Sequence, residues 1–146
     1  MRQFAGASVA LLLLAACQSD QGEANIPGNA VDDQPYDGIA ESETVHFTGT
    51  EPFWGGQVAG GSLTYTTPEN IDGRTFAVER FAGRGGLSYS GTLEGRDFSL
   101  AVTPGECSDG MSDRAYPFTA TLLVNGETHN GCAWTDVQSF TGPEQP

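Results

Sequence analysis

The sequence contains no lysine and only six arginines, whereas 19 residues are acidic. The formal net charge at pH 7 is therefore −13. A surface so poor in positive charge repels the phosphates of nucleic acids and of anionic lipid head groups, so we expect no nucleic-acid ligand and no docking on anionic lipid. Solubility accounts for such a charge, and the same charge also favours a cationic partner or divalent ions.

Long hydrophobic runs are equally scarce. The one marked run, residues 7–14, is too short to cross ~30 Å of hydrocarbon as a permanent helix. It follows Arg2 and ends in Leu14-Ala15-Ala16-Cys17. This stretch resembles the lipobox of bacterial lipoproteins, which implies that residues 1–16 are a cleaved signal peptide and that Cys17 carries the lipid. The alternative is an ordinary signal peptide followed by a chance cysteine.

Lipidation of Cys17 predicts a protein anchored in the cell envelope. Several acyl chains make the anchor stable, because each buried methylene contributes about 0.8 kcal/mol. No second hydrophobic segment follows, so the lipid is the expected membrane attachment. By analogy with lipoproteins, Gln18 permits transfer to the outer membrane, facing the periplasm. The mature chain then holds 19 acids against five arginines, a net charge of −14.

The chain divides by composition into four parts. After the signal peptide, residues 17–40 hold the lipidated cysteine and a flexible tether, which is acidic and has only scattered apolar residues. Such a segment cannot bury enough apolar surface to offset its ordering entropy. Residues 41–140 are expected to form a single β domain, and residues 141–146 a disordered tail.

Apolar and polar residues alternate throughout the expected domain, which is typical of half-buried strands. Glu94-Gly95 and Asn125-Gly126 supply two-residue hairpin turns, because both residues of such a turn must tolerate positive φ. No stretch has helical periodicity. We predict an all-β fold, a small antiparallel barrel or sandwich of about eight strands, since closure removes aggregation-prone edges. The expected strands are residues 44–48, 53–58, 62–66, 76–79, 87–93, 98–102, 118–124 and 128–133.

Two cysteines remain after lipidation, Cys107 in an expected loop and Cys132 at the end of the last hairpin. An exported domain lies in an oxidising compartment, so we predict a disulfide between them. It closes a loop of about 25 residues, worth roughly 3 kcal/mol in the chain-entropy model. A metal site would need more soft ligands, and a redox pair would be closer in sequence.

Two segments stand out as candidates for function: residues 49–54 (GTEPFW) and residues 107–118 (CSDGMSDRAYPF). With Gly131-Cys132-Ala133, they resemble a family of small uncharacterised bacterial envelope proteins, often lipoproteins, over residues 45–134. The resemblance implies an exported, mostly β domain without an established activity.

Each segment has a structural and a functional interpretation. Pro52 favours an extended Glu51, and Phe53 and Trp54 then point to opposite faces, so at most one of them is in the core. The structural interpretation places Trp54 in the core and Glu51 at a turn, makes Asp109 and Asp113 turn formers, and uses Arg114 to neutralise their loop. The functional interpretation makes these residues one binding cluster at a barrel mouth. The candidate binding residues are Glu51, Trp54, Asp109, Asp113 and Arg114.

Catalysis and metal binding find little support in the sequence. There is no Gly-x-Ser-x-Gly elbow, so we expect no enzyme, and no cofactor. Asn70, Asp72, Gly73 and Glu79 fall at calcium-loop spacing, but Pro68 occupies the first ligand position and no helices flank the loop, so we expect no metal.

The functional expectation is a non-catalytic binding or structural module of the envelope, with an envelope component or a basic protein as partner. The alternative is an inhibitor of a cationic secreted enzyme such as a lysozyme, because known lysozyme inhibitors include small lipoproteins with eight-stranded barrels and one disulfide. The sequence lacks the serine–glycine and lysine-containing loop segments of those inhibitors.

Overall fold

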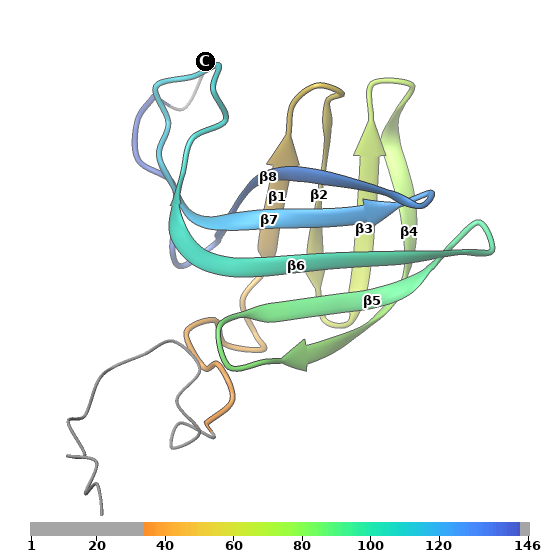
Figure 1. The fold of residues 1–146 in the computed structure, drawn as a ribbon, viewed down its shortest axis with the longest axis horizontal. Coiled ribbons are helices and arrows are strands. Elements are labelled where there is room, and N and C mark those ends of the chain that lie inside the picture. The colour runs from red at the N-terminus through yellow and green to blue at the C-terminus, as the bar shows by residue number, and fades with distance from the viewer. Residues whose placement is uncertain (1–33, 144–146) are drawn as a thin grey trace, which may run out of the picture. The chain divides into compact units, whose positions relative to one another are not determined.

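The computed structural model describes residues 34–143, and these form eight strands that close into an antiparallel barrel (Figure 1). Each strand pairs with the next along the chain, and β1 pairs with β8 to close the barrel. The predicted all-β fold is confirmed, and of the two predicted architectures the barrel is the one observed. The strands are β1 (Val45–Gly49), β2 (Trp54–Ala59), β3 (Ser62–Thr67), β4 (Asn70–Ala82), β5 (Leu87–Leu93), β6 (Arg96–Cys107), β7 (Tyr116–Val124) and β8 (Glu127–Thr135).

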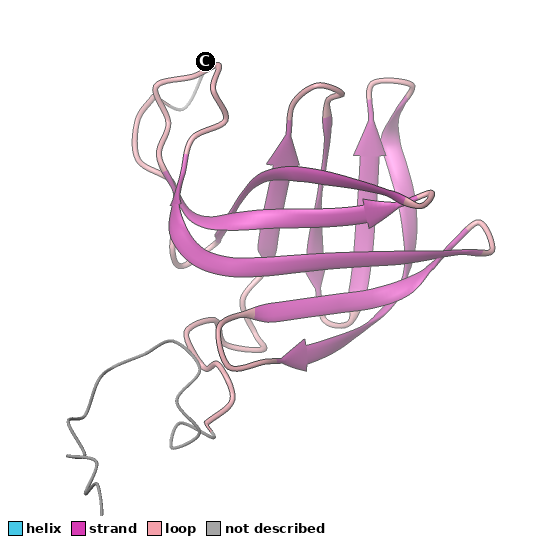
Figure 2. Cartoon of the chain, in the orientation of Figure 1, coloured by secondary structure: helices cyan, strands magenta, loops and turns pink. Residues whose placement is uncertain are grey.

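Strands and turns account for the whole described region, and no helix in it is long and apolar enough to cross a membrane (Figure 2). The tight hairpins fall where the sequence predicted them. Asn125 and Gly126 have φ values of 55° and 81°, as a mirror-image two-residue turn requires, and Glu94-Gly95 has the same conformation. The turn chemistry therefore sets the register of β5 with β6 and of β7 with β8; these four strands lie across β1–β3 in Figure 1.

The core lies inside the barrel and is built from alternate residues of the strands. Phe98 is central: the rings of Tyr65 and Phe76 meet its ring edge-on, with centroids 5.6 Å and 4.9 Å away. Because successive side chains of a strand point to opposite faces, the predicted alternation matches the observed burial. The buried hydrophobic side chains include Val45, Phe47, Val58, Leu63, Leu87, Leu100, Val102, Phe118, Leu122 and Val124.

Both ends of the domain extend beyond the predicted limits. Ile39, expected in the tether, is 1% exposed and belongs to the core. The Tyr36 amide donates to the Gly83 carbonyl, and Arg80 donates to the Ile39 carbonyl. At the other end, Thr141 pairs with Ala115, so residues 141–143 are not a free tail. Both segments are short and mostly polar, and their order comes from tertiary contacts that composition does not show. Cys17 and the signal peptide lie outside the described residues.

Strands β4 and β6 exceed their predicted lengths the most. β4 begins at Asn70, so the residues at calcium-loop spacing lie in a strand paired with β3. β6 runs to Cys107, which was expected in a loop, and a register shift between Pro104 and Cys107 accommodates its non-alternating end. Bulges of this kind let a strand bend and continue where the sequence pattern breaks off.

Candidate functional site

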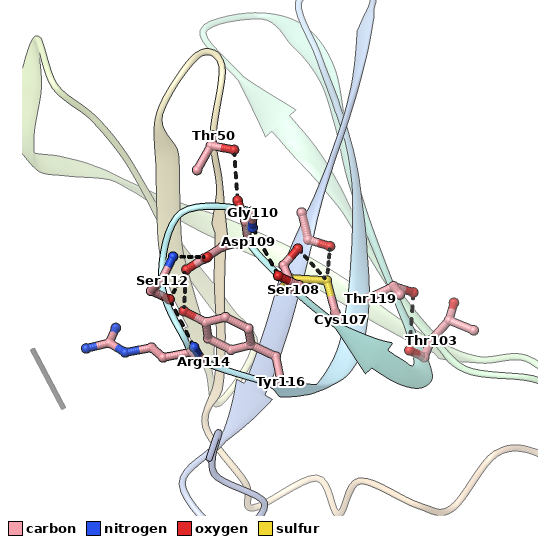
Figure 3. The surroundings of a disulfide bond; sticks show 12 residues. Thr50, Thr103, Cys107, Ser108, Asp109, Gly110, Ser112, Arg114, Tyr116 and Thr119 are labelled. Carbon is pink, nitrogen blue, oxygen red and sulfur yellow. Dashed lines mark hydrogen bonds between the residues drawn. A yellow bond between two sulfur atoms is a disulfide. The ribbon is translucent and has the colours of Figure 1, made fainter. Parts of the chain in front are cut away.

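The predicted disulfide is confirmed: Cys107 at the end of β6 is bonded to Cys132 within β8, with their Cα atoms 5.6 Å apart. Cys132 pairs with Thr119 of β7 and with Thr48 of β1. The bridge therefore reaches across β7 to the seam where the barrel closes. It fixes the start of the connection between β6 and β7, residues 108–115, which we name the Asp109 loop (Figure 3).

Asp109 organises this loop through its carboxylate. One oxygen accepts hydrogen bonds from the amides of Met111 and Ser112, at 2.9 Å and 2.8 Å. The other accepts from the Ser112 hydroxyl at 2.7 Å and from the Tyr116 hydroxyl at 3.1 Å. A carboxylate has about four lone-pair positions, so donors of the loop and Tyr116 of β7 together occupy all of them.

These hydrogen bonds also hold Asp109 in its charged form. The Ser112 hydroxyl makes the largest contribution to lowering the pKa of Asp109 from 3.8 to about 2, followed by the amides of Ser112 and Met111 and by the Tyr116 hydroxyl; desolvation opposes them. Charge-assisted hydrogen bonds are stronger than neutral ones. The arrangement is that of a turn former.

Arg114 faces the C-terminal segment. Its Nε atom donates to the Pro143 carbonyl at 2.8 Å, and its guanidinium lies 4.5 Å from the centre of the Phe140 ring. In Figure 3 its side chain points away from the Asp109 carboxylate. Asp113 is exposed. The Arg114 amide donates to the Ser112 hydroxyl at 3.3 Å, whereas its guanidinium contacts the C-terminal segment.

The two candidate segments meet, although they are far apart in sequence. The Thr50 hydroxyl donates to the Asp109 carbonyl at 3.4 Å across a separation of 59 residues (Figure 3). Glu51 follows Thr50 and is exposed. Its φ of 58° is not the extended conformation expected before Pro52, because the chain must reverse within residues 50–53 to pair Gly49 with Trp54. The structure thus joins the segments through Thr50, which belongs to the candidate segment 49–54 but was not among the candidate binding residues.

Trp54 is in the core, 4% exposed, and Phe53 is on the opposite face, 53% exposed. A Cβ atom at either Gly49 or Gly131 would overlap the indole ring, so both glycines make room for it. Cys107 Sγ lies 3.3 Å from the Gly131 carbonyl oxygen, a contact that places the disulfide beside this packing. The Trp54 Nε1 donor is buried and has no hydrogen-bond partner within residues 34–143.

An apolar pocket of about 340 Å³ lies at the same end of the barrel. The β1–β2 and β3–β4 connections share this end, because β2 pairs antiparallel with β3 and Gly55 stands opposite Thr66. Gly55 also stands opposite Thr48 of β1, so a residue without a side chain lies between two threonines. We name the hollow the Gly55 pocket. Its lining is Thr48, Gly49, Phe53, Trp54, Gly55, Thr66, Thr67, Pro68 and Ile71.

Of the five predicted binding residues, only Trp54 lines this pocket. Phe53 and Ile71, which are 53% and 80% exposed, were not among the candidates. No signal in the sequence pointed to Ile71, because a single apolar residue among polar neighbours is ordinary and its exposure is visible only in the structure. Its partner segment, β1–β2, becomes adjacent only through strand pairing.

No family model, no curated protein and no solved structure matches the chain. Across residues 34–143, no three side chains of the metal-ligating types come together. The candidate site is therefore defined by its own geometry: an uncharged apolar pocket, next to a polar loop held by a disulfide.

Proposed function

We propose that the protein is a lipid-anchored envelope protein whose barrel is a non-catalytic binding module, and that the Gly55 pocket is its binding surface. One observation carries the proposal: Phe53 and Ile71 expose large apolar side chains at the rim of an open pocket. Exposed apolar side chains gathered at a concave surface mark binding sites in proteins that otherwise bury such groups.

The chemistry of the pocket supports binding over catalysis. Its lining includes no carboxylate, imidazole or thiol, and its polar side chains are the hydroxyls of Thr48, Thr66 and Thr67. Hydroxyls of this kind orient a ligand, whereas acid–base chemistry needs a group that titrates near the working pH. The floor is formed by paired strands, so a ligand meets a surface that is already ordered, which lowers the entropy cost of binding.

The anchor is proposed from the sequence and has its own test. Cys17→Ser removes the thiol that would carry the lipid. We expect this variant to leave the membrane fraction or to accumulate as an unprocessed precursor. Detection of a mature-sized Cys17→Ser protein in washed membranes would refute the anchor and leave the binding module untouched.

The binding module is tested by capture from solubilised envelope fractions with the immobilised full-length protein. The double variant Phe53→Ser/Ile71→Ser removes both exposed pocket residues. Phe81→Ser/Val137→Ser is the matched control, because Phe81 and Val137 are 67% and 72% exposed and do not line the pocket. We expect the first pair alone to lose the captured component; equal capture by both pairs would contradict the proposed binding surface.

A further inference from the structure

Three exposed acidic residues lie next to the lining of the Gly55 pocket in the sequence. Glu51 precedes the Pro52-Phe53 edge, Glu69 follows Pro68, and Asp72 follows Ile71. All three are exposed. We name them the acidic rim; each is within two residues, in sequence, of a side chain that lines the pocket.

No arginine lines the same pocket, so its lining carries no positive charge. The arginine nearest to the rim in sequence is Arg74, and its guanidinium pairs with Glu94 at 3.2 Å, on the next hairpin. The exposed charge of the residues that neighbour this apolar lining in sequence is therefore negative. Complementary charge around an apolar contact steers association and selects the partner.

We propose that the Gly55 pocket binds an apolar side chain of a basic polypeptide, and that the acidic rim binds the lysines or arginines next to that side chain. This inference rests on the proposed binding function and names its partner by chemistry. Phe53 and Ile71 contact the apolar side chain, and the threonine hydroxyls of the lining bond to the peptide backbone.

Other occupants fit less well. Nucleic acids and anionic lipids carry phosphates, which the rim and the net charge of −13 repel. A small neutral apolar ligand would use the pocket but not the rim. At about 340 Å³ the pocket is near the lower end for small-molecule sites, and it has room for one large side chain presented by a longer chain.

The test uses a fluorescent five-residue peptide with one phenylalanine between two pairs of lysines. Its binding to the full-length protein, held in nanodiscs of uncharged lipid, is followed by fluorescence anisotropy. We expect saturable binding with a dissociation constant below about 1 mM. Replacing the phenylalanine by alanine, or the lysines by glutamates, should abolish it.

Variants of the protein separate the pocket from the rim. Phe53→Ser/Ile71→Ser should weaken peptide binding at least tenfold at any salt concentration. Glu51→Gln/Glu69→Gln/Asp72→Asn should weaken it about fivefold to tenfold at low salt, with the difference fading at 1 M salt, where the Debye length is about 3 Å. The matched control removes three exposed acids elsewhere, Asp37→Asn/Glu79→Gln/Asp97→Asn, and should change binding less than twofold.

Two results would overturn the inference. One is equal weakening by the rim variant and by its control, which would reduce the effect to net charge. The other is failure of the lysine–phenylalanine peptide to bind, while Phe53→Ser/Ile71→Ser still abolishes capture of an envelope component. That second outcome would keep the proposed function and refute the basic partner. If the pocket variant retained both peptide binding and capture of the envelope component, the proposed function and the basic partner would both be refuted.

Discussion

The Asp109 loop contacts Thr50 of the β1–β2 connection, and Phe53 of the same connection lines the Gly55 pocket, yet the side chains of loop and pocket are used in opposite ways. In the loop, the Asp109 carboxylate is saturated by four donors of residues 111–116, and the Cys107–Cys132 bond fixes its start. In the pocket, Phe53 and Ile71 are exposed, and the acidic residues near them in sequence are exposed as well.

This difference shows which polar residues can act on another molecule. A charged residue in a distinctive motif is available for binding only if its hydrogen-bonding capacity is not already used. Asp109 stabilises the loop, and the loop in turn supports Thr50 and the β1–β2 connection. The large apolar side chains that remain exposed nearby are those of Phe53 and Ile71, which line the Gly55 pocket.

Removal of Trp54 should have the largest effect on stability. Trp54→Ala leaves a cavity between Phe47, Gly49 and Gly131, and such truncations cost about 3–5 kcal/mol. Urea unfolding measures the change. Phe81→Ala, which truncates an exposed aromatic residue, should stay within about 0.5 kcal/mol. If the two variants unfolded alike, Trp54 would not be a core residue of the barrel end.

Loss of the disulfide should come next. Cys107→Ser/Cys132→Ser opens a loop with a sequence separation of 25 residues, and the chain-entropy model gives a loss of about 3 kcal/mol. Hydrogen exchange should report faster opening of the Asp109 loop than of β2 and β3. Uniformly faster exchange over the whole barrel would show that the bridge does not act on this loop in particular.

Asp109→Ala should cost about 2 kcal/mol at neutral pH, because it removes charge-assisted hydrogen bonds. The pKa of Asp109 is lowered in the folded protein, to about 2, so its contribution is fully present above its usual pKa of 3.8 and is lost as the pH falls towards 2. The stability difference between wild type and variant should therefore shrink over that range.

The neighbouring exposed acid supplies the control for this prediction. Asp113→Ala removes the same charge from the same loop, and we expect less than about 0.5 kcal/mol. Chemical unfolding from pH 2 to pH 7 compares the two variants. Similar losses for both would mean that net charge, rather than the hydrogen bonds of Asp109, stabilises the loop.

Most of the barrel could be predicted from the sequence, because alternation and turn chemistry are local. Asn125-Gly126 and Glu94-Gly95 specify their hairpins within two residues. The order of Ile39 and of Thr141 could not be predicted, since each depends on a partner more than 25 residues away. The same holds for the bulge that carries Cys107 into β6.

The candidate site was harder to predict than the fold. The sequence motif of residues 107–118 favoured Asp109, Asp113 and Arg114 as binding residues. The pocket instead arises where Gly55 lies between Thr48 and Thr66 on the neighbouring strands. That hollow depends on the register of β1 with β2 and of β2 with β3. A sequence shows Gly55 as one glycine among 20, without its neighbours across the sheet.

The smallest effect on stability is expected for Phe53→Ser/Ile71→Ser, because both side chains are already exposed; we expect less than about 0.5 kcal/mol in urea unfolding. The same variant should lose binding of the lysine–phenylalanine peptide. Asp109 should therefore affect stability, whereas Phe53 and Ile71 should affect binding.

The most direct measurement is the affinity of that peptide for Phe53→Ser/Ile71→Ser and for Asp109→Ala, each compared with wild type under conditions where all three are folded. We expect at least a tenfold loss of affinity for the pocket variant and less than a twofold change for Asp109→Ala. A tenfold loss in Asp109→Ala together with unchanged affinity in the pocket variant would contradict this expectation and would place the binding surface on the Asp109 loop.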